Sequence, residues 1–341
     1  KIKKFMFNNK TILITGGTGS FGKKIIKRLL NDYKPKKVII YSRDELKQYN
    51  LQRELVKFKK QVRFFIGDVR DLPRLKKSLE KVNYVIHAAA LKHVPVAEYN
   101  PFEAVKTNII GTQNIVEASL EMGVEKVIAL STDKASSPVN LYGATKLTAD
   151  KLVVAGNYHK GTAITKLSVV RYGNVFGSRG SIVPHLLNFK KNSKFPVTDV
   201  DMTRFTITLS DSVEFVMNCF KNMWGGEIFI PKIPSYKLID LVAALSNNIK
   251  TKIIGIRPGE KIHEEMISIN EALNTLECKD RYIICPSSEF VGWNIKKYKE
   301  KFNAKPCKGN FSYASNKNKF LTINELKKMV KNNITDFELD N

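Results

Sequence analysis

Short apolar runs rich in β-branched residues recur along the first half of the chain, each followed by a polar loop and a helical pattern. These runs are predicted to be buried strands: Lys10–Thr15, Lys37–Tyr41, Val62–Ile66, Tyr84–Ala88, Lys126–Leu130 and Thr165–Arg171. Helices are predicted between them, for example over Lys23–Leu30 and Phe102–Glu121. Regular alternation of strand and helix is typical of a parallel sheet covered on both faces. The sequence therefore predicts an α/β fold with a doubly wound parallel sheet of the Rossmann type.

The regular alternation ends near residue 174. Shorter elements are predicted beyond it: an extended segment Phe195–Thr198, a helix begun by Asp211 and Glu214, a strand Glu227–Ile230, a helix from Ser235 to about Leu245, and a last helix with the capping box Thr322 and Glu325. We expect residues 1–174 to form the Rossmann domain, with 203–232 returning to it. Residues 175–202 and 233–341 are expected to form a smaller, substrate-binding α/β domain.

A glycine-rich turn follows the first predicted strand. Gly17, Gly19 and Gly22 satisfy G-x-G-x-x-G, and they lie between a strand and a helix, which is the context that this motif requires. The glycines allow a tight turn and close approach of the backbone to a pyrophosphate, and the helix N-terminus favours the anion. We expect a dinucleotide site here; the alternative is a structural glycine turn.

The residues after the second strand indicate which dinucleotide is bound. An NAD site usually has an acid there that holds the ribose 2′-hydroxyl. This chain has Ser42 and Arg43, with Lys47 one helical turn on, and a hydroxyl with two cations suits a 2′-phosphate. NADP is therefore favoured, although Asp44 and Glu45 oppose this interpretation or else mark a helix start.

Polar residues also follow the next strands. Asp68 and Val69 are expected to contact the adenine, and Ala88 leaves room for the nicotinamide ribose. His87 and His93 are expected to be structural and receive no catalytic role. Asn108, inside the predicted helix Phe102–Glu121, either fixes the active-site backbone or is a solvated side chain.

The fifth strand leads into the stretch that carries the chemistry, Ser131–Lys146. Tyr142 and Lys146 are four residues apart, so they share one helix face. A nearby cation lowers the pKa of a tyrosine, which would make the phenol able to take a proton near neutral pH. Upstream, Thr132, Asp133 and Lys134 lie at a strand end, where open α/β sheets bind ligands. A helix start with an ordinary surface lysine is the alternative.

Composition and charge indicate which other partners and sites are not expected. The 341 residues are 43% hydrophobic, and the net charge is +25. The lysines are spread along the chain without interleaved aromatic residues, so we expect no nucleic-acid partner, and a positive field that attracts anionic small molecules. No signal peptide or membrane span is recognised, and the four cysteines show no metal spacing, so we expect a cytoplasmic protein with reduced thiols and no metal or membrane site.

Several motifs together carry a resemblance to a known family: Thr15–Gly22, Tyr41–Glu45, His87–Lys92, Ser131–Lys134, Tyr142-x-x-x-Lys146, Arg171–Asn174 and Arg257–Lys261. They resemble the extended short-chain dehydrogenase/reductase family, and more narrowly its inverting UDP-N-acetylglucosamine 4,6-dehydratases. Asp133-Lys134 is the most specific sign, because hexose dehydratases usually carry Asp-Glu there and 4-epimerases carry neither. Ser136-Ser137 and Thr206 depart from the family pattern.

The resemblance implies an NADP-dependent lyase reaction with inversion at C5, the first step of pseudaminic acid biosynthesis, which leads to flagellin or surface-glycan modification. By resemblance the catalytic residues are Thr132, Asp133 (acid), Lys134 (base), Tyr142 and Lys146. The cofactor residues that it implies are Thr18, Gly19, Ser20, Phe21, Ser42, Arg43, Asp44, Glu45, Leu46, Lys47, Asp68, Val69, Ala88, Lys92, Tyr142, Lys146, Val175, Phe176, Gly177, Ser178 and Arg179. The substrate residues that it implies are Lys92, Asn174, Ile182, Thr198, Arg257 and Glu260.

Two alternatives remain open at the level of the sequence. A UDP-sugar 4-epimerase would share the fold, the cofactor and the Tyr142–Lys146 pair, but it needs no Asp133-Lys134 pair. A non-catalytic NADP-binding sensor would commonly lack the tyrosine or the lysine, and this chain retains both. Arg257 and Glu260 form either a clamp on a diphosphate and a ribose or a surface ion pair. Because the family usually assembles, a homo-oligomer is expected.

Overall fold

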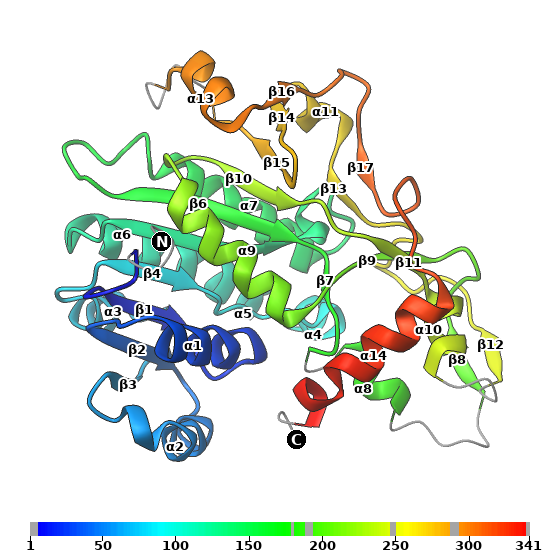
Figure 1. The fold of residues 1–341 in the computed structure, drawn as a ribbon, viewed down its shortest axis with the longest axis horizontal. Coiled ribbons are helices and arrows are strands. Elements are labelled where there is room, and N and C mark those ends of the chain that lie inside the picture. Colours follow the sequence, from blue (N-terminus) through cyan, green and yellow to red (C-terminus); the bar gives the residue numbers. More distant parts are fainter. Residues whose placement is uncertain (1–5, 179–180, 188–193, 246–249, 287–292, 339–341) are drawn as a thin grey trace.

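The structure, a computed structural model, describes residues 6–178, 181–187, 194–245, 250–286 and 293–338. A ten-stranded sheet with the order β16-β14-β15-β10-β6-β5-β4-β1-β2-β3 forms its centre (Figure 1). The strands of this sheet are β1 (Thr11–Thr15), β2 (Lys37–Ser42), β3 (Val62–Ile66), β4 (Tyr84–His87), β5 (Lys126–Thr132), β6 (Lys166–Tyr172), β10 (Ile228–Pro231), β14 (Thr275–Glu277), β15 (Arg281–Ile284) and β16 (Lys305–Pro306). The seven strands from β3 to β10 run parallel, and the last three are antiparallel.

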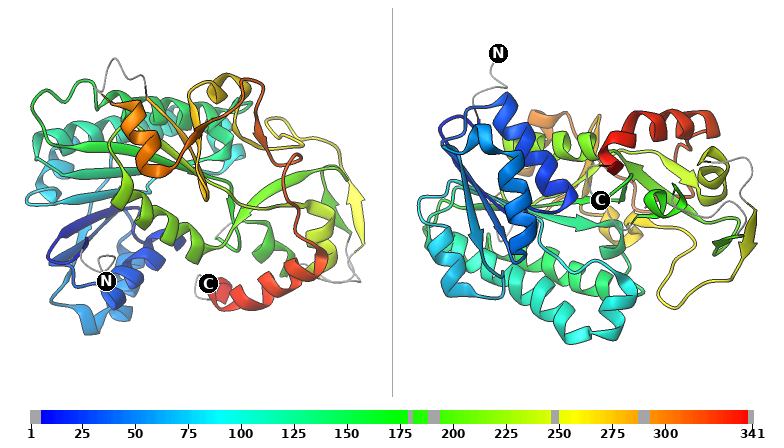
Figure 2. Two further views of the ribbon diagram at one scale, coloured as in Figure 1. Left: turned by 45° about the horizontal axis from the view of Figure 1, so that its top comes forward. Right: turned by 90° about the horizontal axis from the view of Figure 1, so that it is seen from below.

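Helices cover both faces of the sheet, as Figure 1 and the edge-on view in Figure 2 show. Helices α1 (Ser20–Asp32) and α9 (Leu209–Asn222) pack together on one face, while α3 (Leu72–Ser78), α6 (Gly111–Glu121) and α7 (Leu141–Ala155) pack in a row on the other. Every residue of β1 is buried, and the core of the sheet is built from Ile, Val and Leu, as expected for parallel strands buried on both faces. The predicted doubly wound α/β fold is confirmed.

The segment predicted as one helix over Phe102–Glu121 is divided. It consists of α5 (Pro101–Ala104), a π-helical turn over Val105–Ile110, and α6. The turn contains buried Asn108, whose side chain bonds the backbone of Leu91 on both sides, with Nδ2 to the carbonyl at 2.9 Å and Oδ1 from the N–H at 2.8 Å. Single π-helical turns are often found at functional sites, and this one reaches the loop after β4.

The remaining elements lie around the sheet. They are α2 (Glu45–Glu54), a 3-10 turn Val56–Phe58, α4 (Val94–Tyr99), a 3-10 turn Asp133–Ala135, β7 (Asn174–Val175), α8 (Ile182–Leu187), β8 (Phe195–Val197), β9 (Thr203–Ile207), β11 (Ser235–Lys237), α10 (Leu238–Leu245), β12 (Thr251–Ile253), β13 (Glu265–Ile267), α11 (Ile269–Ala272), α13 (Ile295–Phe302), β17 (Tyr313–Ala314) and α14 (Ile323–Glu338). In the described ranges, no helix combines the length and the apolar character needed to span a bilayer.

A second, smaller hydrophobic core lies beside the sheet. It joins Phe176, the α8–β8 region, α10 and α14, and α14 lies against α10 at the C-terminal end of the chain (Figure 1). Most of its residues come from 176–202, 236–244 and 326–330. The second core therefore follows the expected smaller domain through part of its length.

The expected boundaries differ from the sheet in one region. Residues 233–341 were assigned to the smaller domain, but β15 pairs with β10, and β14 and β16 continue the same sheet. The strand predicted at Glu227–Ile230 returns to the sheet as β10, beside β6. The division into two domains stays a prediction, and we propose that strands β14, β15 and β16 belong with the Rossmann sheet.

Candidate active site

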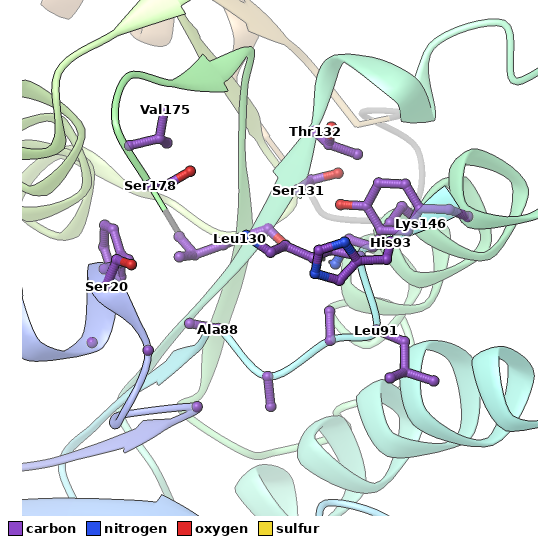
Figure 3. A pocket seen from close by; sticks show the side chains of 18 of the residues that line it. Ser20, Ala88, Leu91, His93, Leu130, Ser131, Thr132, Lys146, Val175 and Ser178 are labelled. Atoms are coloured by element: carbon purple, nitrogen blue, oxygen red, sulfur yellow. Dashed lines mark hydrogen bonds between the residues drawn. The ribbon is translucent and has the colours of Figure 1, made fainter. Parts of the chain in front are cut away.

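A cleft of about 830 Å³ opens at the carboxyl ends of the parallel strands. Side chains from the turn after β1, from the loops after β2 to β6 and from the turn near residue 260 line it. In Figure 3, Ser20 and Ser178 lie at one end, Lys146 and His93 at the other, and Ala88 and Leu130 between them. This is the edge at which open α/β sheets bind ligands.

The glycine turn at one end of the cleft fits a dinucleotide. Gly16 has φ +65°, and a Cβ on Gly22 would lie 2.5 Å from the Cα of Gly17, so α1 can approach the turn this closely only with glycine there. The N-cap of α1 is Gly19, which has no side chain to cap the first-turn N–H groups. An open helix N-terminus beside a bare backbone suits a pyrophosphate.

The residues predicted to select NADP also lie along the cleft, but their charges are partly paired. Asp44 accepts a bond from the backbone N–H of Lys47 as the N-cap of α2, and its carboxylate lies 2.7 Å from the Lys47 ammonium. The Arg43 guanidinium lies 3.8 Å from Asp68, which is also bonded by Arg70. Asp44 therefore caps the N-terminus of α2, which is the role that the sequence left open as an alternative to selecting NAD.

The predicted site residues divide into two groups. Those that line the cleft are Thr18, Gly19, Ser20, Phe21, Ser42, Arg43, Asp44, Lys47, Asp68, Val69, Ala88, Lys92, Thr132, Lys134, Tyr142, Lys146, Asn174, Val175, Ser178, Ile182 and Glu260. Glu45 and Leu46 are instead exposed on the surface of α2, and Phe176, with Gly177 beside it, is buried in the second core. These four residues are not among those that line the cleft, and their contacts with the cofactor stay predictions. Arg179 lies outside the described residues.

Lys134 is held between two carboxylates. Its ammonium lies 3.1 Å from Oδ1 of Asp133 and 3.1 Å from Oε1 of Glu264. Burial alone would lower the pKa of Lys134, but the negative charges of Asp133 and Glu264 outweigh it, and the pKa is raised. The resemblance implies that Lys134 is a base, which must be neutral, but in the structure the two carboxylates stabilise the ammonium.

Asp133 is a completely buried carboxyl group. Its Oδ1 accepts bonds from the Thr132 hydroxyl at 3.0 Å and from Lys134 at 3.1 Å, while Oδ2 has no hydrogen-bond partner among the described residues. Burial raises the pKa of Asp133, against the opposing effect of Lys134. A buried carboxyl group with a raised pKa is suited to act as a general acid.

Tyr142 and Lys146 share one face of α7, as predicted, but they are not directly coupled. The Lys146 ammonium donates to the Leu130 carbonyl at 2.8 Å. Burial raises the pKa of Tyr142 to about 12, while Lys134 and a hydrogen bond with Thr132 act in the opposite direction. The predicted lowering of the Tyr142 pKa by Lys146 is therefore wrong for this geometry, because burial is the larger effect.

Two buried polar side chains, His87 and Asn108, form hydrogen bonds that connect the elements around the site. His87 bridges the hydroxyls of Thr15 at 2.8 Å and Thr112 at 3.1 Å. Asn108 donates to the Thr145 hydroxyl at 3.0 Å in addition to holding Leu91, so it joins the loop after β4 to α7. Of the two roles that the sequence left open for Asn108, the structure shows the first.

The predicted substrate residues of the C-terminal part do come together. The Thr198 hydroxyl donates to Glu260 at 3.0 Å, and the guanidinium of Arg257 lies 4.0 Å from the same carboxylate. The turn that carries them is attached to the start of α7, because Asn140 donates to the Gly259 carbonyl at 2.7 Å. Glu260 lines the cleft, whereas Thr198 and Arg257 are not among the residues that line it.

A family model described as "Polysaccharide biosynthesis protein" matches residues 12–286. The chain belongs to this family.

Individual proteins and a solved structure that are similar to this chain support the same assignment. The UDP-N-acetylglucosamine 4,6-dehydratase (inverting) of Campylobacter jejuni subsp. jejuni serotype O:2 is 55% identical, covering 92% of this chain and 94% of that protein. The UDP-glucose 4-epimerase of Rickettsia rickettsii is 42% identical, covering 82% and 84%. The X-ray structure of Pen from Bacillus thuringiensis has a TM-score of 0.87 at 41% identity and covers 97% and 99% of the two chains. The predicted resemblance is confirmed.

The residues that line the cleft also include polar and charged side chains that the sequence did not assign to the site, among them Asn140, Arg204 and Glu264. The Nε of Arg204 lies 3.8 Å from Glu264. Nothing in the sequence separates Glu264 from the neighbouring Glu265. Asn140, as N-cap of α7, could have been found from its place just before the helix.

Proposed function

We propose that this protein is a UDP-N-acetylglucosamine 4,6-dehydratase that inverts C5 and produces UDP-2-acetamido-2,6-dideoxy-beta-L-arabino-hex-4-ulose. The observation that supports this most is that Lys134 and Asp133, in the turn after β5, are close enough to Tyr142 on α7 to influence its pKa. An amine and a protonated carboxyl group supply the base and the acid that loss of water requires. The relative that is 55% identical carries this name.

Each side chain has a separate task in the proposed reaction. Tyr142 takes the proton of the sugar O4, for which the phenol must be ionised; Lys134 and the hydrogen bond with Thr132 favour the phenolate, against burial. Lys134 takes the C5 proton, which the new C4 ketone makes acidic, and Asp133 gives its proton to the departing C6 hydroxyl. A proton from solvent then adds to C5 on the opposite face and inverts that centre. Lys134 must be neutral to act as a base.

The cofactor that we propose is NADP. It would bind through the glycine turn, with Ser42, Arg43 and Lys47 at the ribose phosphate, and it would accept a hydride from C4 and return it to C6. The three side chains line the same end of the cleft. Arg43 and Lys47 are both about half exposed, and the Lys47 side chain is long and flexible. Both can therefore reach the ribose 2′-phosphate of NADP.

We propose further that the product enters pseudaminic acid biosynthesis and that the enzyme is a cytoplasmic homo-oligomer. UDP-glucuronic acid, UDP-glucose and UDP-N-acetylglucosamine share the nucleotide and differ at C2 and C6, so a panel of them tests the substrate. The expected result is one product lighter by one water, formed from UDP-N-acetylglucosamine, and detected by mass spectrometry.

The same panel tests the rival activity. A 4-epimerase would leave the mass unchanged and equilibrate the C4 configuration, which proton NMR resolves. Epimerisation without loss of water would contradict the proposed dehydration. A protein that binds the dinucleotide but changes none of the sugars would be a sensor.

A further inference from the structure

Glu264 is a buried carboxylate in the cleft with one oxygen still available. Its side chain is 3% exposed, Oε1 lies 3.1 Å from the Lys134 ammonium, and Oε2 has no hydrogen-bond partner among the described residues. A buried carboxylate oxygen without a partner is costly, so it needs an explanation in the chemistry of the site. Oε2 can accept one more hydrogen bond or one proton.

The backbone around Glu264 is fixed independently of Lys134. Its N–H donates to the Ser315 hydroxyl at 2.9 Å, and its carbonyl accepts from the Ser315 N–H at 2.8 Å. The position is just before β13, which pairs with β17. The C-terminal part of the chain therefore holds this carboxylate against a lysine on the end of β5.

The charges around Glu264 come from every side of the pocket. Lys134 and Asp133 belong to the turn after β5, Arg204 to β9, and Lys261 to the same loop as Glu264. Burial alone would raise the pKa of Glu264, but Lys134, Arg204 and Lys261 lower it, so Glu264 is ionised in the structure. Tyr236, on β11, faces Arg204, Lys134 and Asp133 from the remaining side.

The amine of Lys134 has to lose a proton before it can act on C5, and the site offers two carboxylates as acceptors. In the proposed reaction Asp133 supplies a proton to the C6 hydroxyl, so it acts as the acid and Glu264 remains as the acceptor. Glu264 is ionised, in contact with the ammonium, and has a free oxygen. It is therefore the acceptor that the geometry offers.

We propose that Glu264 takes the proton of Lys134 when a sugar nucleotide fills the cleft and excludes water, because loss of solvation favours the neutral pair over the buried ion pair. An N–H bond of Lys134 breaks and an O–H bond of Glu264 forms, which leaves an electron pair on Nζ. That pair then binds the C5 hydrogen, and the electrons of the C5–H bond stay on the sugar as the enolate of the C4 ketone. Lys134 passes this proton over 3.1 Å to Asp133, replacing the one that left with the C6 hydroxyl.

Because Glu264 acts through Lys134 and not on the sugar, it is a positioning residue. This inference rests on the proposed dehydration, and its test uses a pH profile. In the wild type, the proton moves within the protein, so kcat should be nearly constant between about pH 6 and about pH 8. In Glu264→Gln the ammonium must lose its proton to solvent, so kcat should rise about tenfold per pH unit.

The same variant has a second signature. Hydride transfer from C4 precedes removal of the C5 proton, so slowing the second step should let reduced dinucleotide accumulate, seen by its near-ultraviolet absorbance. At neutral pH we expect kcat of Glu264→Gln to fall about a hundredfold, the usual contribution of one proton transfer. Glu264→Asp keeps a carboxylate, so it should restore the constant profile at a lower kcat.

The matched control is Glu265→Gln, the adjacent residue, whose carboxylate accepts from the Ser137 hydroxyl at 3.0 Å. It should behave as the wild type. A constant profile in Glu264→Gln, no accumulation of reduced dinucleotide, or an equal effect of Glu265→Gln would overturn the proposal. Retained dinucleotide and an unchanged unfolding transition show that the variants are folded. Failure of the proposed function is seen separately, since the wild type would then release no water.

Discussion

At the scale of single residues, the buried titratable groups decide how the protein responds to pH. His87 is 1% exposed in the middle of the sheet, between two threonine hydroxyls. Burial, with a smaller effect of Lys146, lowers the pKa of His87 from 6.5 to about 3. Between these values the unfolded chain binds a proton that the native protein does not, so stability falls as the pH falls through this window.

His87→Gln should remove that pH dependence while keeping a polar side chain between Thr15 and Thr112. Between about pH 7 and about pH 5, the wild type is expected to lose about 2 kcal/mol more unfolding free energy than the variant. Urea unfolding at the two pH values measures it. Equal losses in the two proteins would contradict a neutral, buried His87.

The residues that sequence patterns could identify are those whose role is set by neighbours in the chain. Asp133, Lys134 and Tyr142 were found because a strand end and a helix start place them together. Glu264 was not found, because only the fold brings it to Lys134. The raised pKa of Lys134 could not be predicted for the same reason, since it depends in part on a carboxylate distant in the sequence.

At the scale of elements, the strands were predictable because they are buried on both faces and therefore uniformly apolar. The break at Val105–Ile110 was not, because its cause is a contact of Asn108 with another loop. The turn between β1 and α1 was predictable from its glycines. Its geometry explains them: α1 touches the turn at Gly22 and Gly17 with no room for a Cβ.

Gly22→Ala should therefore push α1 away from the turn. We expect a loss of about 1–3 kcal/mol in stability, typical of overpacking, together with loss of bound dinucleotide. Thermal unfolding and the dinucleotide content of the purified protein measure both. Gly309→Ala is the control, because its added Cβ would make an ordinary contact at 3.6 Å with Leu273 and should change stability by less than about 0.5 kcal/mol. Full dinucleotide content in Gly22→Ala would contradict this role of the turn.

At the scale of the whole molecule, the C-terminal part of the chain completes a site that the Rossmann sheet begins. The turn at residues 257–261 is bonded to the start of α7, and Glu264 reaches Lys134. The sequence predicted a smaller domain but not that β14, β15 and β16 return to the large sheet, because short strands leave only a weak pattern. Neither the contact of the turn at residues 257–261 with the start of α7 nor the contact of Glu264 with Lys134 could be predicted from the composition.

The most direct test of the central claim, that Lys134 and Asp133 carry out dehydration with inversion, is proton NMR of the product formed from UDP-N-acetylglucosamine in heavy water. The account predicts a C6 methyl group, deuterium at C5 and the L-arabino configuration, and in Lys134→Ala bound dinucleotide without loss of the C5 proton. Retained C5 configuration, hydrogen at C5, or full turnover by Lys134→Ala would contradict it.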